Sequence, residues 1–166
     1  MPTKIINGLN INYEECGGGF PFVLAHGYCA SIQMWKHQIP WLAERYRVIA
    51  YDARGHGLSS APPNPEDYSL EQLVDDMRSL LDQLDVKEAY LAGHSMGGAT
   101  VAGFTARHPE RARATFICNI DGGHQPSDPE GQRQAEQDRQ RNHALARDRG
   151  LSDYARHQLE SGAAPR

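Results

Sequence analysis

The stretch of sequence that decides the fold spans residues 89–98 and reads AYLAGHSMGG. Its first six residues form a short apolar run that is typical of a buried parallel strand. The Ala- and Gly-rich segment that follows, from Met96 to about Arg107, predicts a helix that stops near Pro109. Between them, residues 93–97 match the pattern G-x-S-x-G, in the strand-to-helix context that this motif requires.

The residue types in this turn point to nucleophilic chemistry at Ser95. A serine on so tight a turn has a strained backbone, and side chains two residues to either side would collide. Gly93 and Gly97 remove those collisions. The turn also places Ser95 at the positive end of the following helix, which favours developing negative charge. We therefore predict that Ser95 is the attacking residue.

A second element lies upstream, where His26-Gly27-Tyr28 directly follows the apolar run PFVLA. A tetrahedral intermediate needs two N–H donors aimed at its oxyanion. The residue after the nucleophile, Met96, supplies one of them. Because Gly27 permits a close approach of its loop, the backbone N–H of Tyr28 is the natural second donor.

The rest of the first 121 residues alternates strands with helices. Asn7-Gly8 marks a hairpin turn, YRVIAYD (46–52) and ATFICNID (114–121) are further buried strands, and Ser69 with Gln72 forms the capping box of a helix. This pattern predicts an α/β fold with a mostly parallel sheet, preceded by an antiparallel hairpin.

Three segments, HGYCASIQMW, YRVIAYDARGHGLSS and LAGHSMGG, resemble the α/β-hydrolase superfamily in order and spacing over residues 20–121. They are most similar to its bacterial cofactor-free esterases, perhydrolases and carbon–carbon bond hydrolases. The resemblance implies Ser95 as nucleophile, an oxyanion hole from Tyr28 and Met96, and no metal or organic cofactor. Superfamily members that open epoxides or remove halogen carry Asp in place of Ser95, so these activities are disfavoured. Asp52 and Arg54 are expected to tie their loop together.

The chain departs from the family after residue 121. The family's sheet continues for two more strands, which usually carry the catalytic acid and the histidine, and this chain lacks both strands. Asp121 stands where some members carry the acid, so it is a catalytic candidate, and His124 is a weaker candidate for the base. The alternative is that both belong to a Gly-rich turn. His26 is expected to brace its loop, and His56 to lie on a turn.

Composition changes near residue 124. We assign residues 1–123 to a partial α/β-hydrolase core and residues 124–166 to either the start of a helical cap or a mobile polar tail. The only large apolar residues of the second segment are Leu145, Leu151, Tyr154 and Leu159. Because no strand follows residues 114–120, that edge of the sheet is expected to self-associate.

The composition also bears on partners and location. A formal net charge of −4 without a basic stripe gives no reason to expect nucleic acid. No apolar stretch is long enough to span a bilayer, and the N-terminus lacks the apolar core of a secretory signal. Cys16, Cys29 and Cys118 have no C-x-x-C spacing, so we expect free thiols and a cytoplasmic location.

Two functional hypotheses follow. The first is a serine hydrolase that cleaves a small ester, thioester or lactone through an acyl-serine intermediate, with carbon–carbon bond hydrolysis and perhydrolysis left open. The alternative is a truncated, catalytically incompetent hydrolase that acts as a binding protein, because the late catalytic histidine is absent.

Overall fold

The fold is seen in a computed structural model, which describes residues 2–119, 128–134, 136–137 and 140–141. The chain divides into two units, Met1–Ile120 and Asp121–Arg166, and each is described by itself. The elements of the first unit are, in chain order, β1 (Thr3–Ile6), β2 (Leu9–Cys16), β3 (Phe20–Ala25), η1 (Ile32–Trp35), α1 (Gln38–Ala43), β4 (Tyr46–Tyr51), η2 (Pro65–Tyr68), α2 (Leu70–Gln83), β5 (Ala89–His94), α3 (Met96–Arg107), η3 (Pro109–Arg111) and β6 (Ala112–Cys118).

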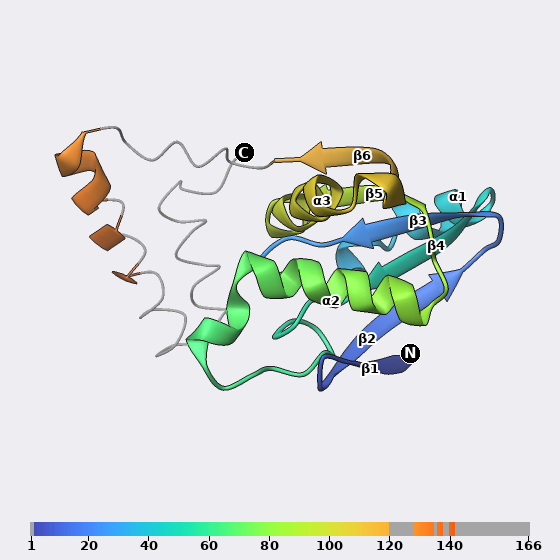
Figure 1. The fold of residues 1–166 in the computed structure, drawn as a ribbon, viewed down its shortest axis with the longest axis horizontal. Helices are drawn as coiled ribbons and strands as arrows, with labels where there is room; N and C mark the ends of the chain where they lie inside the picture. The colour runs from blue at the N-terminus through green and yellow to red at the C-terminus, as the bar shows by residue number, and fades with distance from the viewer. Residues whose placement is uncertain (1, 120–127, 135, 138–139, 142–166) are drawn as a thin grey trace. The chain divides into compact units, whose positions relative to one another are not determined.

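The strands form one mixed sheet in the order β1-β2-β4-β3-β5-β6 (Figure 1). The β1–β2 hairpin is antiparallel, β2 also runs antiparallel to β4, and the neighbours from β4 to β6 are parallel. The predicted α/β architecture, a mostly parallel sheet preceded by an antiparallel hairpin, is confirmed.

Two local signals in the sequence lead to the expected structures. Asn7 and Gly8 connect β1 to β2 with φ of 48° and 81°, and positive φ at both central residues is what a two-residue hairpin turn of this kind requires. Ser69 caps α2 through a capping box, in which its side chain accepts from the Gln72 N–H and the Gln72 side chain accepts from the Ser69 N–H.

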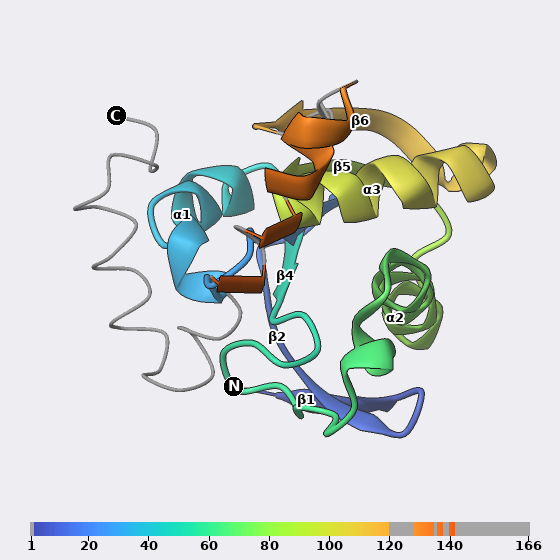
Figure 2. The ribbon, with the colours of Figure 1, turned by 90° about the vertical axis from the view of Figure 1, so that its left-hand side faces the viewer.

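Alternate residues of the central strands point to opposite faces of the sheet, and helices cover both faces. In β3, Val23 and Ala25 pack with the helices α2 and α3, whereas Leu24 packs with η1 and α1. Figure 2 shows α1 on one side of the sheet and α2 and α3 on the other. The apolar face of α2 is buried through Leu73, Val74, Met77, Leu80 and Leu81, although Leu70 at its start is 41% exposed.

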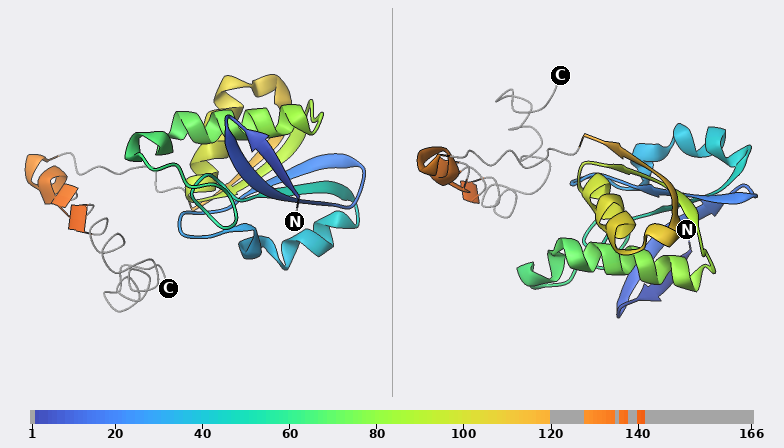
Figure 3. Two further views of the ribbon diagram at one scale, coloured as in Figure 1. Left: turned by 90° about the horizontal axis from the view of Figure 1, so that it is seen from below. Right: turned by 45° about the horizontal axis from the view of Figure 1, so that its top comes forward.

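The N-terminal hairpin is held to α2 by polar contacts. Asn7 donates to Asp75 and Asp76 at 3.0 and 2.8 Å, and the Gln83 side chain donates to the Ile5 carbonyl at 2.7 Å. Figure 3 shows the hairpin lying beside this helix. These contacts extend the packing of α2 to the first edge of the sheet.

The last described strand, β6, forms the opposite edge. It spans Ala112–Cys118, so it begins two residues before the predicted run and ends before Asn119, whose φ of 54° leaves the extended conformation. Thr115 contacts Thr105 of α3 at 2.7 Å, so Ile117 shares that face while Phe116 lies on the other. Phe116 is 65% exposed and Ile117 44%.

We expect this edge to pair with β6 of a second copy, because an apolar edge strand presents unpaired backbone groups. Ile117→Lys should weaken association roughly tenfold, since two-fold antiparallel pairing brings like charges close together. Sedimentation velocity over a concentration series measures this, with Leu58→Lys as the matched control because Leu58 is an exposed apolar residue in the loop after β4. A wild-type chain that stays a cooperative monomer at high concentration would refute the expectation.

In the second unit, the structure describes helical turns at residues 129–134. Asp128 accepts a hydrogen bond from the Gly131 N–H at 2.7 Å, as an N-cap residue does. The prediction that residues 124–166 form a cap or a tail remains a prediction, because most of this segment lies outside the described residues.

Candidate active site

Ser95 lies between β5 and α3 in the strand-turn-helix context that the motif predicts. Its φ of 50° and ψ of −115° are unfavourable for a residue with a side chain. Its backbone N–H donates to the Cys118 carbonyl of β6 at 2.9 Å, which anchors the turn to the neighbouring strand. Although Ser95 is the N-cap residue of α3, its side chain makes no capping hydrogen bond, so the hydroxyl is not used to stabilise the helix.

The two flanking glycines allow this turn. A Cβ at Gly93 would collide with the carbonyl of Gly97, and a Cβ at Gly97 would collide with the carbonyl of Ala25. The start of α3 therefore packs directly on the carboxyl end of β3. The predicted role of both glycines is confirmed, and it extends further than predicted because Gly97 also brings the turn against the β3 loop.

The loop after β3 is the predicted second half of the oxyanion hole. The Ala30 N–H donates to the Gly27 carbonyl at 3.2 Å and closes a turn in which Cys29 has a φ of 57°. A Cβ at Gly27 would lie 2.7 Å from Nδ1 of His94. This close approach explains the need for glycine and places the loop beside the Ser95 turn.

The loop after β3 carries an aromatic side chain, Tyr28, and a thiol, Cys29. Tyr28 is 55% exposed, and its ring meets His56 edge-on with centroids 5.7 Å apart. His56 is held in place because its Nδ1 donates to the Arg54 carbonyl at 2.9 Å. Burial raises the pKa of the Cys29 thiol, which disfavours the thiolate form that a cysteine nucleophile needs.

Asp52 and Arg54 hold the loops after β3 and β4 in place by hydrogen bonds, as predicted. The buried Asp52 carboxylate accepts from the Ile32 N–H at 2.8 Å, the Leu58 N–H at 3.0 Å and the Asn12 side chain at 2.8 Å. It thereby joins three segments near the carboxyl ends of β3 and β4.

Arg54 forms a buried pair with α2. Its guanidinium donates to both Asp76 oxygens at 2.6 and 2.8 Å and to the Asp67 carbonyl at 2.6 Å. The hydrogen bonds to Asp76 raise the pKa of Arg54. The pair therefore ties the loop after β4 to α2.

The structure thus brings the loop of Tyr28 and the turn of Ser95 and Met96 together at the carboxyl ends of β3 and β5. Asp121 and His124 lie outside the described residues. Among the hydrogen bonds of the described residues, none joins the Ser95 hydroxyl to a histidine. The sequence did not predict that His56 would meet the Tyr28 ring or that His94 would lie close to Gly27, because neither approach follows from spacing along the chain.

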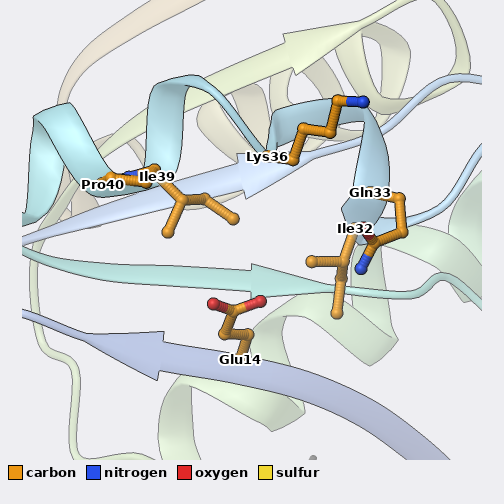
Figure 4. Close-up of a pocket in the computed structure, with 6 residues that line it drawn as sticks. All are labelled: Glu14, Ile32, Gln33, Lys36, Ile39 and Pro40. Atoms are coloured by element: carbon orange, nitrogen blue, oxygen red, sulfur yellow. The ribbon is translucent and has the colours of Figure 1, made fainter.

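Two cavities open beside this region without including it. One of about 200 Å³ lies between β2 and α1, and Figure 4 shows Glu14 pointing from β2 toward Ile32 and Ile39 of its lining. The other, of about 270 Å³, is lined by Ser31, Ile32, Gln33, Asp52, Gly57 and Leu58. Neither cavity is lined by Ser95, Met96 or Tyr28. The candidate site is therefore the turn at Ser95 and not one of these cavities.

Further features concern ions, thiols and membranes. Within the described ranges, no three His, Cys, Asp or Glu side chains gather closely enough to hold a metal ion. Cys16, Cys29 and Cys118 are free thiols, as predicted. No helix in the part of the chain that the structure describes is long and apolar enough to cross a bilayer.

The comparison with known proteins identifies the family. The family model of the alpha/beta hydrolase fold matches residues 21–159, and the chain therefore belongs to this family. It is 40% identical over 123 residues to bifunctional epoxide hydrolase 2 of Sus scrofa, a match that covers 74% of this chain and 22% of that protein. It is also 34% identical over 119 residues to 3-oxoadipate enol-lactonase 2 of Acinetobacter baylyi, covering 70% and 44%.

A solved structure shows the same likeness. The enol-lactonase of Burkholderia xenovorans is 37% identical, with a TM-score of 0.68 over 72% of this chain and 46% of that one. The chain thus spans less than half the length of each of these relatives.

Proposed function

We propose that this chain carries the nucleophile of a hydrolase that cleaves small esters, thioesters or lactones through an acyl-serine intermediate. The observation that carries the proposal is the state of Ser95. Its backbone has an unfavourable φ of 50°, its hydroxyl does not cap α3, and its turn lies against the Gly27 loop. Strain of this kind persists only where the surrounding structure enforces it, and it is concentrated at functional sites.

The proposed reaction has two steps. The Ser95 oxygen attacks the carbonyl carbon while its proton passes to a histidine base, and the N–H groups of Tyr28 and Met96 stabilise the oxyanion. The leaving alcohol, thiol or enol takes that proton as its bond to the acyl carbon breaks. Water then cleaves the acyl-serine and regenerates the hydroxyl. Within this chain, Asp121 is the candidate for the catalytic acid and His124 the candidate for the histidine base.

The relatives include enzymes named for lactones and for epoxides, and the chemistry of serine favours the first group. Attack of an alcohol oxygen on an epoxide carbon would form an ether. An ether has no carbonyl for water to attack, so the enzyme would remain alkylated. An acyl-serine is an ester, which water can cleave.

The test is a panel of a p-nitrophenyl ester, a thioester, a small lactone and a styrene-type epoxide. We expect hydrolysis of the first three substrates, with a burst of p-nitrophenol from the ester and of thiol from the thioester, and no diol from the epoxide. Diol formation without ester cleavage would contradict the proposal.

A second candidate is a non-catalytic binding protein, favoured by the absence of a histidine bonded to the Ser95 hydroxyl among the described residues. Saturable binding of the ester without release of the leaving group would support this alternative.

A further inference from the structure

His26 is a buried titratable residue to which the proposed reaction assigns no step. It directly follows β3 and is 2% exposed. Its Nε2 lies 3.0 Å from the backbone N of Ala53, and its Nδ1 lies 2.8 Å from the carbonyl oxygen of Gly27. The ring therefore bridges the loops that follow β3 and β4.

These two contacts define the protonation state of the ring. The Ala53 N–H can only donate, so Nε2 must accept and carries no proton. The Gly27 carbonyl can only accept, so Nδ1 must carry the proton. Both contacts require the same neutral tautomer.

The contact with Gly27 has a consequence for the proposed oxyanion hole. The Gly27 carbonyl and the Tyr28 N–H belong to one peptide unit, which is planar and trans, so they point in opposite directions. Holding the carbonyl against His26 therefore directs the Tyr28 N–H away from that ring. The Ala30 N–H also donates to this carbonyl, but that bond lies within the turn and would rotate with it. The bond from His26 ties the turn to the loop after β4.

We infer that His26 is a positioning residue, which in its neutral Nδ1–H form aims the Tyr28 N–H at the oxyanion. The inference rests on the proposed function for its catalytic consequence, although the tautomer and the orientation of the peptide do not depend on activity.

The surroundings of the ring favour the neutral form. Burial lowers the pKa of His26 below its ordinary value of 6.5, the nearby His56 acts in the same direction, and the Gly27 carbonyl and Asp52 oppose them. The His26 and His56 rings lie 5.3 Å apart, and His94 approaches the same loop at Gly27. Since an unfolded chain takes up a proton more readily, the folded state should lose stability as the pH falls below about 6.5 toward the lowered pKa.

The first test is nitrogen NMR of the full chain with labelled histidine. We expect the His26 ring to remain neutral, with its proton on Nδ1, at a pH where an exposed histidine is half protonated. A proton on Nε2 would overturn the inference, whether or not the protein is active.

The second test compares two variants that each keep one of the two bonds. In His26→Asn, the side-chain amide can still donate to the Gly27 carbonyl. In His26→Gln, the longer side chain can only replace the acceptor for Ala53. Both should lower the urea midpoint to a similar extent. The rate of labelling by a fluorophosphonate should fall by less than about threefold in His26→Asn and by at least about tenfold in His26→Gln. The larger loss is expected because a misdirected donor loses part of the 10²- to 10³-fold effect of an oxyanion hydrogen bond.

The outcomes separate the two claims. Equal labelling rates in the two variants would show that His26 is only structural and would overturn the inference. A wild-type chain that is not labelled at all would count against the proposed function, and the NMR result would then decide the state of His26 by itself.

Discussion

Gly97→Ala should leave the chain largely unfolded, with a loss of stability of more than about 4 kcal/mol. The added Cβ would lie 2.5 Å from both the carbonyl carbon of Ala25 and the carbonyl oxygen of His26, and it would collide with the oxygen of Ala25. All three atoms belong to the backbone of β3 and its loop, so no side chain can move aside. Urea unfolding followed by circular dichroism measures the loss.

Two other glycines provide graded controls. Gly18→Ala adds a Cβ with no heavy atom within 4 Å, so it should change stability by less than about 0.5 kcal/mol. Gly103→Ala brings its Cβ 2.9 Å from the Val74 side chain, which can shift, and an intermediate loss is expected. If Gly97→Ala unfolds at the same urea concentration as Gly18→Ala, α3 does not pack on the β3 loop as described.

Ser95→Gly should abolish ester hydrolysis, by at least about 10⁴-fold, while raising stability by about 1 kcal/mol. The two effects have separate causes. The loss of turnover follows from the missing hydroxyl, and the gain in stability follows because glycine adopts a φ of 50° without strain. Initial rates with a p-nitrophenyl ester and urea midpoints measure the two effects on the same preparations.

Ser95→Ala is the matched variant for this pair. Alanine removes the hydroxyl but keeps the Cβ, so we expect the same loss of turnover without the gain in stability. Turnover that persists in both variants would assign the reaction to another residue. A lower stability of Ser95→Gly would show that the backbone at this turn is not strained.

Features encoded by neighbouring residues could be predicted from the sequence. The bounds of β5 and α3 agree with the predicted run and helix, and the capping box of Ser69 and Gln72 forms as expected. In each case a few adjacent residues determine the backbone, through a turn, a cap or a repeat of apolar positions.

Contacts between distant segments could not be predicted in this way. The bond between His26 and Ala53 joins residues from two loops, and Arg54 of the loop after β4 pairs with Asp76 of α2. The start of β6 was missed for a related reason, since Ala112 enters the strand by pairing with Ala89 and not through its own propensity. Tertiary pairing decides such positions.

The most direct test of the central claim is to locate a covalent adduct after reaction of the chain with a fluorophosphonate. Trypsin should release residues 88–107 as one peptide, and Ser95 is its only serine. The account predicts that this peptide gains the mass of the phosphonyl group and that its fragments place the group on Ser95. An adduct on another residue, such as Tyr28, with Ser95 unmodified would contradict the account.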